Sequence, residues 1–280
     1  MRWLTFSDDL GLSYGLLHGD RVQAVGRLAG APATLRQALA AKVLASLAAE
    51  AGAAPELALD ALTLLPPIPD PEKILCVGLN YRAHQAEMGR GGEGYPTIFT
   101  RFPSSQIGHE QAMIRPLESA TLDYEGEIAL VIGSPGRRIE RAQAMDHVFG
   151  ISIYNDGSVR EYQRQTSQFT PGKNFPATGA FGPWIVTPDE IADLDAMELT
   201  TRLNGEIMQQ ARAADMVHDF AAIIAYCSIF TELVPGDVLV TGTPGGVGAA
   251  RTPPVFMDDG DRVEVALSGV GELRNSVVVG

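Results

Sequence analysis

Three acidic side chains are the residues of this sequence best suited to chemistry. The segment 121–133 reads TLDYEGEIALVIG, and side chains of a strand alternate between its two faces. Glu125 and Glu127 therefore point the same way, onto a face that becomes apolar two residues later. A third acid, Asp156, follows the apolar run FGISIY. Because carboxylates seldom begin a buried face without a partner, these acids are candidates for one shared site.

Clustering of three carboxylates predicts a divalent cation. Each close pair would repel by about 4 kcal/mol at an effective dielectric constant near 20, and a cation removes that cost. Ligation by oxygen alone is typical of Mg²⁺ or Mn²⁺, whereas zinc prefers His and Cys, and the sequence contains neither CxxC nor HExxH. Taken singly, Glu-x-Glu fits a solvated strand end, and Asp156 fits a helix N-cap.

A second candidate pair is His84 and Glu87, in GLNYRAHQAEMGRGGEG at 78–94. In a helix, residues three apart lie on one face, so the carboxylate could orient the imidazole to take a proton from water. An exposed helical His near a Glu is the alternative. The glycines at 89–94 match G-x-G-x-x-G, but the strand–turn–helix context of a dinucleotide site is missing. We expect these glycines to form a mobile lid.

Three further places carry charge or glycine. Arg160 and Gln163 lie about one turn apart in REYQ, and Lys173 stands between Gly and Asn in a loop. The segment LVPGDVLVTGTPGGVG ends a predicted strand in a turn that contains Thr241 and Thr243. It lacks GK[ST], so it is not a Walker phosphate loop. Each of these features, taken singly, fits a solvated charge or a turn.

Composition limits the partners and the compartment. The 280 residues are 45% hydrophobic and 20% charged, and the net charge of −13 argues against nucleic acid or an anionic membrane as partner. Cys76 and Cys227 both lie in apolar runs, which fits a reducing cytoplasm better than a disulfide. The start has no apolar core long enough for a signal peptide, and no apolar run is long enough to cross a bilayer. We expect a cytoplasmic protein.

The chain divides into two predicted domains at LPPIPDPEK, because four prolines within 66–71 exclude a helix or a central strand. Residues 1–70 form a small α+β domain, with short strands in 1–30 and a helix over 33–54. Residues 71–280 form the catalytic domain.

The larger domain is predicted to be rich in strands. Asn204-Gly205 indicates a hairpin, and the apolar spacing from Val217 to Cys227 indicates a helix. Strands outnumber helices and do not alternate with them, which favours a β-rich mixed α/β fold over a doubly wound sheet. The predicted strands are ILCVGL, PTIFTR, EIALVIG, HVFGISIY, PWIVT, DVLVTG, DRVEVAL and LRNSVVV.

Four motifs together resemble the fumarylacetoacetate hydrolase family. LDYEGEIALVIG, NDGSVREYQ, GKNF and PGDVLVTGTPGGVG occur in this order, and the resemblance covers about residues 72–280. It implies a mixed β-sheet roll or sandwich with short flanking helices, assembled as a homodimer. It also implies Mg²⁺, Mn²⁺ or Ca²⁺, held by Glu125, Glu127 and Asp156.

The resemblance also assigns roles to other side chains. His84 and Glu87 match a pair that activates water in members that cleave carbon–carbon bonds. Arg101 stands where many relatives have Lys, and Arg160-Glu161 where Arg-Asp is usual. The implied catalytic residues are His84, Glu87 and Lys173. The implied substrate-binding residues are Tyr81, Arg101, Arg160, Gln163 and Thr243.

The resulting hypothesis is metal-dependent hydrolysis of a carbon–carbon bond in an acylpyruvate or related β-diketo acid, in the breakdown of aromatic compounds. His84, oriented by Glu87, draws a proton from water, and the hydroxide attacks the distal carbonyl of a small anionic 2-oxo acid. Two alternatives remain. The same scaffold could serve an isomerase, decarboxylase or hydratase of 2-oxo-diene acids, or a binding protein without catalysis.

Overall fold

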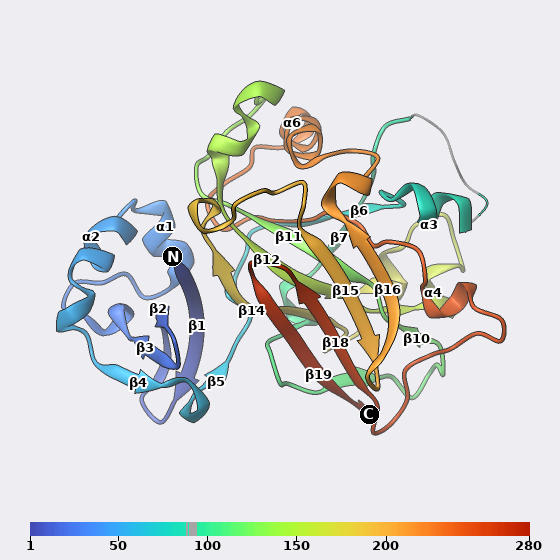
Figure 1. The fold of residues 1–280 in the computed structure, drawn as a ribbon, viewed down its shortest axis with the longest axis horizontal. Helices are drawn as coiled ribbons and strands as arrows, with labels where there is room; N and C mark the ends of the chain where they lie inside the picture. Colours follow the sequence, from blue (N-terminus) through green and yellow to red (C-terminus); the bar gives the residue numbers. More distant parts are fainter. Residues whose placement is uncertain (88, 90–93) are drawn as a thin grey trace.

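The computed structural model describes residues 1–87, 89 and 94–280 (Figure 1). Within this part of the chain, twelve strands form one large sheet and five form a second. The main path of the large sheet runs, in spatial order, through β4 (Glu56–Ala58), β3 (Arg21–Gln23), β2 (Gly11–His18), β1 (Arg2–Asp8), β14 (Gly179–Val186), β12 (Val148–Asp156), β11 (Gly126–Ile132), β17 (Val238–Val240), β6 (Ile74–Gly78) and β7 (Thr97–Arg101). Beside this path, β5 (Thr63–Leu64) pairs with β1 and β8 (Gln106–Ile107) pairs with β14.

The second sheet covers one face of the first (Figure 1). Its order is β16 (Glu206–Arg212), β15 (Glu198–Leu203), β18 (Arg262–Leu267), β19 (Gly271–Val279) and β9 (Met113–Arg115). A short pair joins β10 (Leu122–Asp123) to β13 (Ser158–Val159). Most pairings are antiparallel, but β6 and β17 pair in parallel. This mixed, β-rich architecture with short helices confirms the predicted fold class.

The helices of the described residues are short. The α-helices are α1 (Leu35–Ala40), α2 (Leu44–Ala49), α3 (Arg82–Glu87), α4 (Arg160–Gln163), α5 (Thr170–Lys173) and α6 (Phe220–Phe230). Short 3₁₀ helices lie at Val25–Arg27, Ala51–Ala53, Leu59–Ala61, Pro103–Ser105, Arg141–His147, Pro188–Glu190, Ala213–Asp215 and Gly248–Ala250. In the described part of the chain, no helix is both long and apolar enough to cross a membrane.

Strand β11 is the centre of the core, and each of its residues is buried. Ile128, Leu130 and Ile132 pack toward the second sheet, in a cluster that includes buried residues of β15, β18 and β19. Ala129 and Val131 face the other way, in a cluster with α1 and α2. The strand is therefore apolar on both faces along its second half, which leaves its acidic beginning as the exception.

The predicted single helix over 33–54 is wrong in extent. Thr34 caps α1 by accepting a hydrogen bond from the Gln37 N–H, but the helix ends at Ala40. Lys42 then adopts a left-handed conformation with φ of 57°, which turns the chain before α2. On the two sides of the break, Leu35, Leu39, Leu44 and Leu47 lie in one buried cluster with Ala129 and Val131 of the large sheet.

Two local predictions in the larger domain are confirmed. Asn204 and Gly205 have φ of 53° and 83°, and they join β15 to β16 as a two-residue hairpin. Helix α6 covers Phe220–Phe230, although it ends before Pro235. The N-terminal strands extend the large sheet through the pairing of Arg2 with Val186 and Trp3 with Ile185. The division at 66–71 remains a prediction.

Candidate metal centre and the cavity above it

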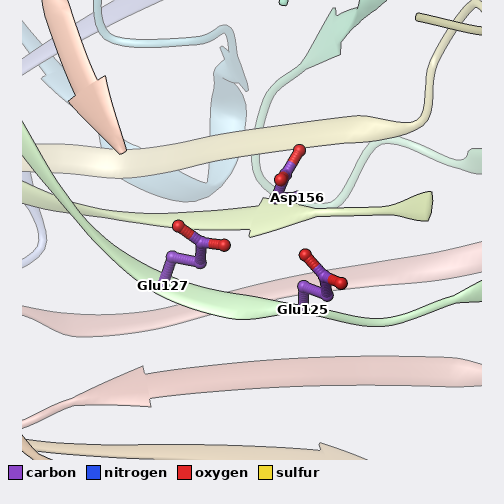
Figure 2. A group of neighbouring side chains, drawn as sticks. All are labelled: Glu125, Glu127 and Asp156. Carbon is purple, nitrogen blue, oxygen red and sulfur yellow. The ribbon is translucent and has the colours of Figure 1, made fainter. Parts of the chain in front are cut away.

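The three predicted carboxylates converge on one point (Figure 2). Glu125 directly precedes β11, Glu127 lies within it, and Asp156 ends the neighbouring strand β12. The register pairs Gly126 with Asn155, and the Asp156 N–H donates to the Glu125 carbonyl oxygen at 2.8 Å. One ligand oxygen from each acid lies within 4.8 Å of the others, and all three residues are buried. The convergence predicted from strand alternation is what the structure contains.

The structure excludes both single-residue alternatives. The two glutamates are only 5% and 2% exposed, so they are not a solvated strand end. Asp156 belongs to β12, and the residue in the N-cap position of α4 is Val159. Because Asp156 does not cap the helix, its carboxylate is free to face the glutamates.

Cations surround most of this cluster. Lys173 Nζ lies 2.7 Å from a Glu125 oxygen and 2.6 Å from an Asp156 oxygen. Arg160 lies 2.6 Å from the other Glu125 oxygen, and Arg101 lies 2.7 Å from the other Asp156 oxygen. Glu127 differs, because among the described residues it has no cationic partner. It accepts a hydrogen bond from the Gly242 N–H at 2.5 Å.

This unequal pairing separates the acidities of the two glutamates. Burial alone would raise the pKa of Glu125, but the charges of Lys173 and Arg160 outweigh it and lower that pKa to about 2. Burial raises the pKa of Glu127 well above its usual value, and repulsion from Asp156 and Glu125 adds to the increase. A group of buried carboxylates with one uncompensated member fits a hard divalent cation, which would supply the missing charge.

Arg101 lies behind the cluster rather than on a cavity wall. Its side chain is completely buried, and Nη1 donates to Asp156 and to the Gly157 carbonyl oxygen at 2.7 and 3.0 Å. Nη2 donates to Thr178 at 2.8 Å, and Nε donates to Ser105 at 3.3 Å. Arg101 therefore orients Asp156, and the substrate contact expected of it remains a prediction.

A cavity of about 300 Å³ opens above the carboxylates. Its wall contains most of the predicted site residues: His84, Glu125, Glu127, Arg160, Gln163, Lys173 and Thr243. The rest of the lining consists of Val77, Gly78, Leu79, Phe99, Arg164, Thr166, Ser167 and Phe169. Acidic, basic and aromatic groups thus share a pocket of the size that small-molecule sites have.

His84 and Glu87 form the predicted pair on α3. His84 Nδ1 lies 3.0 Å from Glu87 Oε2, and Glu87 Oε1 accepts from the Gly246 N–H at 3.0 Å. The carboxylate is thus held from both sides, and it fixes one ring nitrogen of His84. Because Nδ1 is occupied, Nε2 is the ring nitrogen that remains for a bound molecule.

Tyr81 lies close to this site but outside the cavity lining. It is 1% exposed and forms an isolated β-bridge with Met216, and its hydroxyl has no hydrogen-bond partner within the described part of the chain. Its expected contact with substrate remains a prediction. The predicted lid at 89–94 falls mainly on residues 90–93, which are outside the described residues.

Asp123 is a site residue that the sequence assignment omitted. It accepts hydrogen bonds from the Gly248 and Ala249 N–H groups at 2.8 and 2.9 Å, and from Arg160 Nε at 2.8 Å. It therefore anchors Arg160 to the turn after Val247. The signal was present, because strand alternation places Asp123 on the same side as Glu125 and Glu127.

Thr243, rather than Thr241, reaches the cavity. The Thr243 hydroxyl donates to the Gly126 carbonyl oxygen at 2.9 Å and accepts from Gln209 at 2.8 Å. Gln209 also accepts from the Gly126 N–H at 3.0 Å, so it connects the acidic strand with the second sheet. Thr241 donates to the Ile128 carbonyl oxygen and lies within the core.

Comparison with known proteins places this site in a family context. Residues 73–278 match the family model described as fumarylacetoacetate (FAA) hydrolase C-terminal. The mitochondrial oxaloacetate tautomerase of Rattus norvegicus is 41% identical over 218 residues, which are 78% of this chain and 70% of that protein.

Solved structures resemble the whole chain as well. The fumarylacetoacetate hydrolase of Exiguobacterium antarcticum has a TM-score of 0.90 at 35% identity, covering 100% of both chains. The maleylpyruvate hydrolase of Sphingobium sp. SYK-6, in complex with a manganese(II) ion and pyruvate, has a TM-score of 0.83 at 29% identity, again covering 100% of both.

Proposed function

Since this chain belongs to the fumarylacetoacetate hydrolase family, we propose that it is a metal-dependent enzyme that interconverts the keto and enol forms of a 2-oxo acid of the oxaloacetate type. The observation that carries this proposal is the His84–Glu87 pair, held at 3.0 Å on the wall of the cavity that also contains the buried carboxylates. Similarity to an oxaloacetate tautomerase over 78% of the chain supports the choice of reaction.

The side chains have distinct tasks in this reaction. Glu125, Glu127 and Asp156 would hold the cation, which when bound polarises the 2-oxo acid group and makes carbon 3 more acidic. His84 Nε2 takes a proton from carbon 3, and Glu87 keeps the ring oriented. The same proton returns to the oxygen on carbon 2, so the composition of the substrate does not change.

The positive side chains hold the anionic substrate. Lys173 and Arg160 are both buried beside Glu125, and the charges of their acidic neighbours keep both groups protonated. They would bind the carboxylate end of the 2-oxo acid and stabilise the negative charge that develops when carbon 3 loses its proton. Leu79, Phe99 and Phe169 give the cavity apolar walls that reduce access of water.

A second candidate is hydrolysis of a carbon–carbon bond in an acylpyruvate. The same pair could take a proton from water, and the solved maleylpyruvate hydrolase with manganese and pyruvate supports this chemistry on the same fold. Hydrolysis would require a water molecule beside His84, in addition to the groups that tautomerisation uses. An intermediate of aromatic-compound breakdown would then be a suitable substrate.

The test is to follow the decay of enol absorbance after enol-oxaloacetate is mixed with the Mg²⁺-loaded protein. We expect His84→Gln to lower the rate about 10²–10⁴-fold, the contribution of general acid–base catalysis, and exposed His18→Gln to change nothing. Product analysis with a panel of acylpyruvates and oxaloacetate-like acids distinguishes the alternative reactions: pyruvate plus a carboxylate indicates hydrolysis, and carbon dioxide indicates decarboxylation. A decay no faster than in Mg²⁺ without protein would contradict tautomerisation.

A further inference from the structure

The outer wall of the cavity carries a charge that the proposed proton transfer does not use. Arg164 follows α4 directly and lines the cavity together with Ser167. The Arg164 N–H donates to the Arg160 carbonyl oxygen at 3.1 Å, which places Arg164 one helical turn beyond Arg160. Residues four apart lie on the same side of a helix, so the two arginines stand one behind the other along one wall.

Among the described residues, three positively charged side chains line this cavity, and they differ in the carboxylates with which they already pair. Lys173 is paired with Glu125 and Asp156, and Arg160 is paired with Asp123 and Glu125. Arg164 is exposed, and no carboxylate of the described residues pairs with it. Its charge is therefore available to a ligand, whereas the charges of the other two are largely balanced by the cluster.

The inner arginine also has an unused donor. Arg160 is only 5% exposed, and its Nη2 has no hydrogen-bond partner among the described residues. A buried guanidinium nitrogen without a partner is costly, and the carboxylate end of a 2-oxo acid beside the cluster would satisfy it. An anion at Arg160 and a second anion at Arg164 would stand about 6 Å apart along the helix axis, a spacing suited to a short dicarboxylic acid.

We infer that Arg164 determines substrate specificity by binding the distal carboxylate of a 2-oxo dicarboxylic acid. The inference rests on the proposed function for the direction of the substrate, with its 2-oxo acid end at the carboxylate cluster and Arg160. Arg164 is solvent-exposed, so its contribution is moderate, about 3- to 5-fold in affinity. Ser167 contributes a hydroxyl to the same wall.

The test compares two stable acids that share a carbon backbone, 2-oxoglutarate and 2-oxopentanoate, by calorimetric titration of the Mg²⁺-loaded protein. The wild-type chain should bind the dicarboxylate about 3- to 5-fold more tightly than the monocarboxylate. Arg164→Ala should remove this preference by weakening only the dicarboxylate, and Arg164→Lys should keep part of it. Arg137→Ala, at an exposed arginine outside the cavity lining, should retain the wild-type ratio.

Each other outcome has a defined meaning. An unchanged ratio in Arg164→Ala, or equal weakening of both acids, would overturn the role of Arg164 in specificity. Binding with the expected ratios but without tautomerisation would contradict the proposed reaction and leave the specificity assignment standing. If neither acid bound to the loaded wild-type protein, both the proposed function and this inference would fail.

Discussion

Replacement of Arg101 tests how the candidate metal centre is held together. Arg101 is completely buried, and its guanidinium group binds Asp156, Gly157, Thr178 and Ser105. Arg101→Met would leave the Asp156 carboxylate with Lys173 as its one cationic partner among the described residues. Removing one member of a buried ion pair costs about 3–5 kcal/mol, so we expect the free energy of unfolding to fall by that amount without added metal.

The conservative variant separates charge from geometry. Arg101→Lys keeps the positive charge but cannot reach all four partners, so two or more hydrogen bonds of this set are lost. Each buried group left without a partner costs about 1–3 kcal/mol, and partial rearrangement should limit the total loss to about 2–3 kcal/mol. Arg141→Lys is the matched control, because the Arg141–Asp219 ion pair is exposed and should contribute less than about 1 kcal/mol.

The assay is urea-induced unfolding, monitored by circular dichroism, first in EDTA and then with saturating Mg²⁺. The difference in free energy of unfolding between Arg101→Met and the wild-type chain should be smaller with Mg²⁺ than in EDTA, because the cation supplies charge to Asp156 and stabilises the folded state that binds it. The reasoning would be refuted if, in EDTA, Arg101→Met had the same urea midpoint as the wild-type chain and the same dependence of the free energy of unfolding on urea concentration. That result would mean that the cluster does not depend on Arg101.

Two further predictions concern other parts of the molecule. Asp123→Asn should raise KM for the 2-oxo acid about 10-fold or more with little change in Mg²⁺ affinity, because the substitution frees Arg160 but changes none of the proposed metal ligands. Steady-state kinetics would measure KM and calorimetry would measure Mg²⁺ affinity. A parallel loss of Mg²⁺ binding would contradict this prediction. Burial lowers the pKa of His109 from 6.5 to about 4, and its Nδ1 accepts from the Arg274 N–H, so the fold favours the neutral ring. The contribution of neutral His109 to the free energy of unfolding should therefore be fully present above pH 6.5 and fall by at most about 3 kcal/mol as the pH drops toward 4. His109→Gln should make the free energy of unfolding less dependent on pH in this range. The same pH dependence of thermal unfolding in the variant and the wild-type chain would disprove the assignment.

The sequence predicted the site better than it predicted the contacts that support the site. Strand alternation alone placed Glu125 and Glu127 on one face, and the position of Asp156 at the end of the apolar run FGISIY added the third acid. The contact of Gln209 with Gly126 joins residues 83 positions apart, and the Gly242 N–H reaches Glu127 across 115 positions. Such contacts depend on how the two sheets pack, which no local pattern contains.

The fold shows the same division between local and long-range signals. The Asn204-Gly205 hairpin and the strand EIALVIG follow from turn chemistry and alternation, so both were predicted correctly. The break at Lys42 was not predicted, because alanine and leucine favour a continuous helix and Lys42 is not a residue type that commonly adopts the left-handed conformation. Arg101 illustrates a third case, because the resemblance implies a substrate contact for it, whereas the structure places it behind Asp156 and outside the cavity lining.

The most direct test of the metal centre is titration with Mn²⁺ followed by electron paramagnetic resonance. We predict that the wild-type chain binds the ion at this site, that Glu127→Gln weakens binding by at least about 100-fold, and that exposed Asp258→Asn leaves the affinity unchanged. Binding of Mn²⁺ by Glu127→Gln with wild-type affinity would contradict the claim that these buried carboxylates hold a cation.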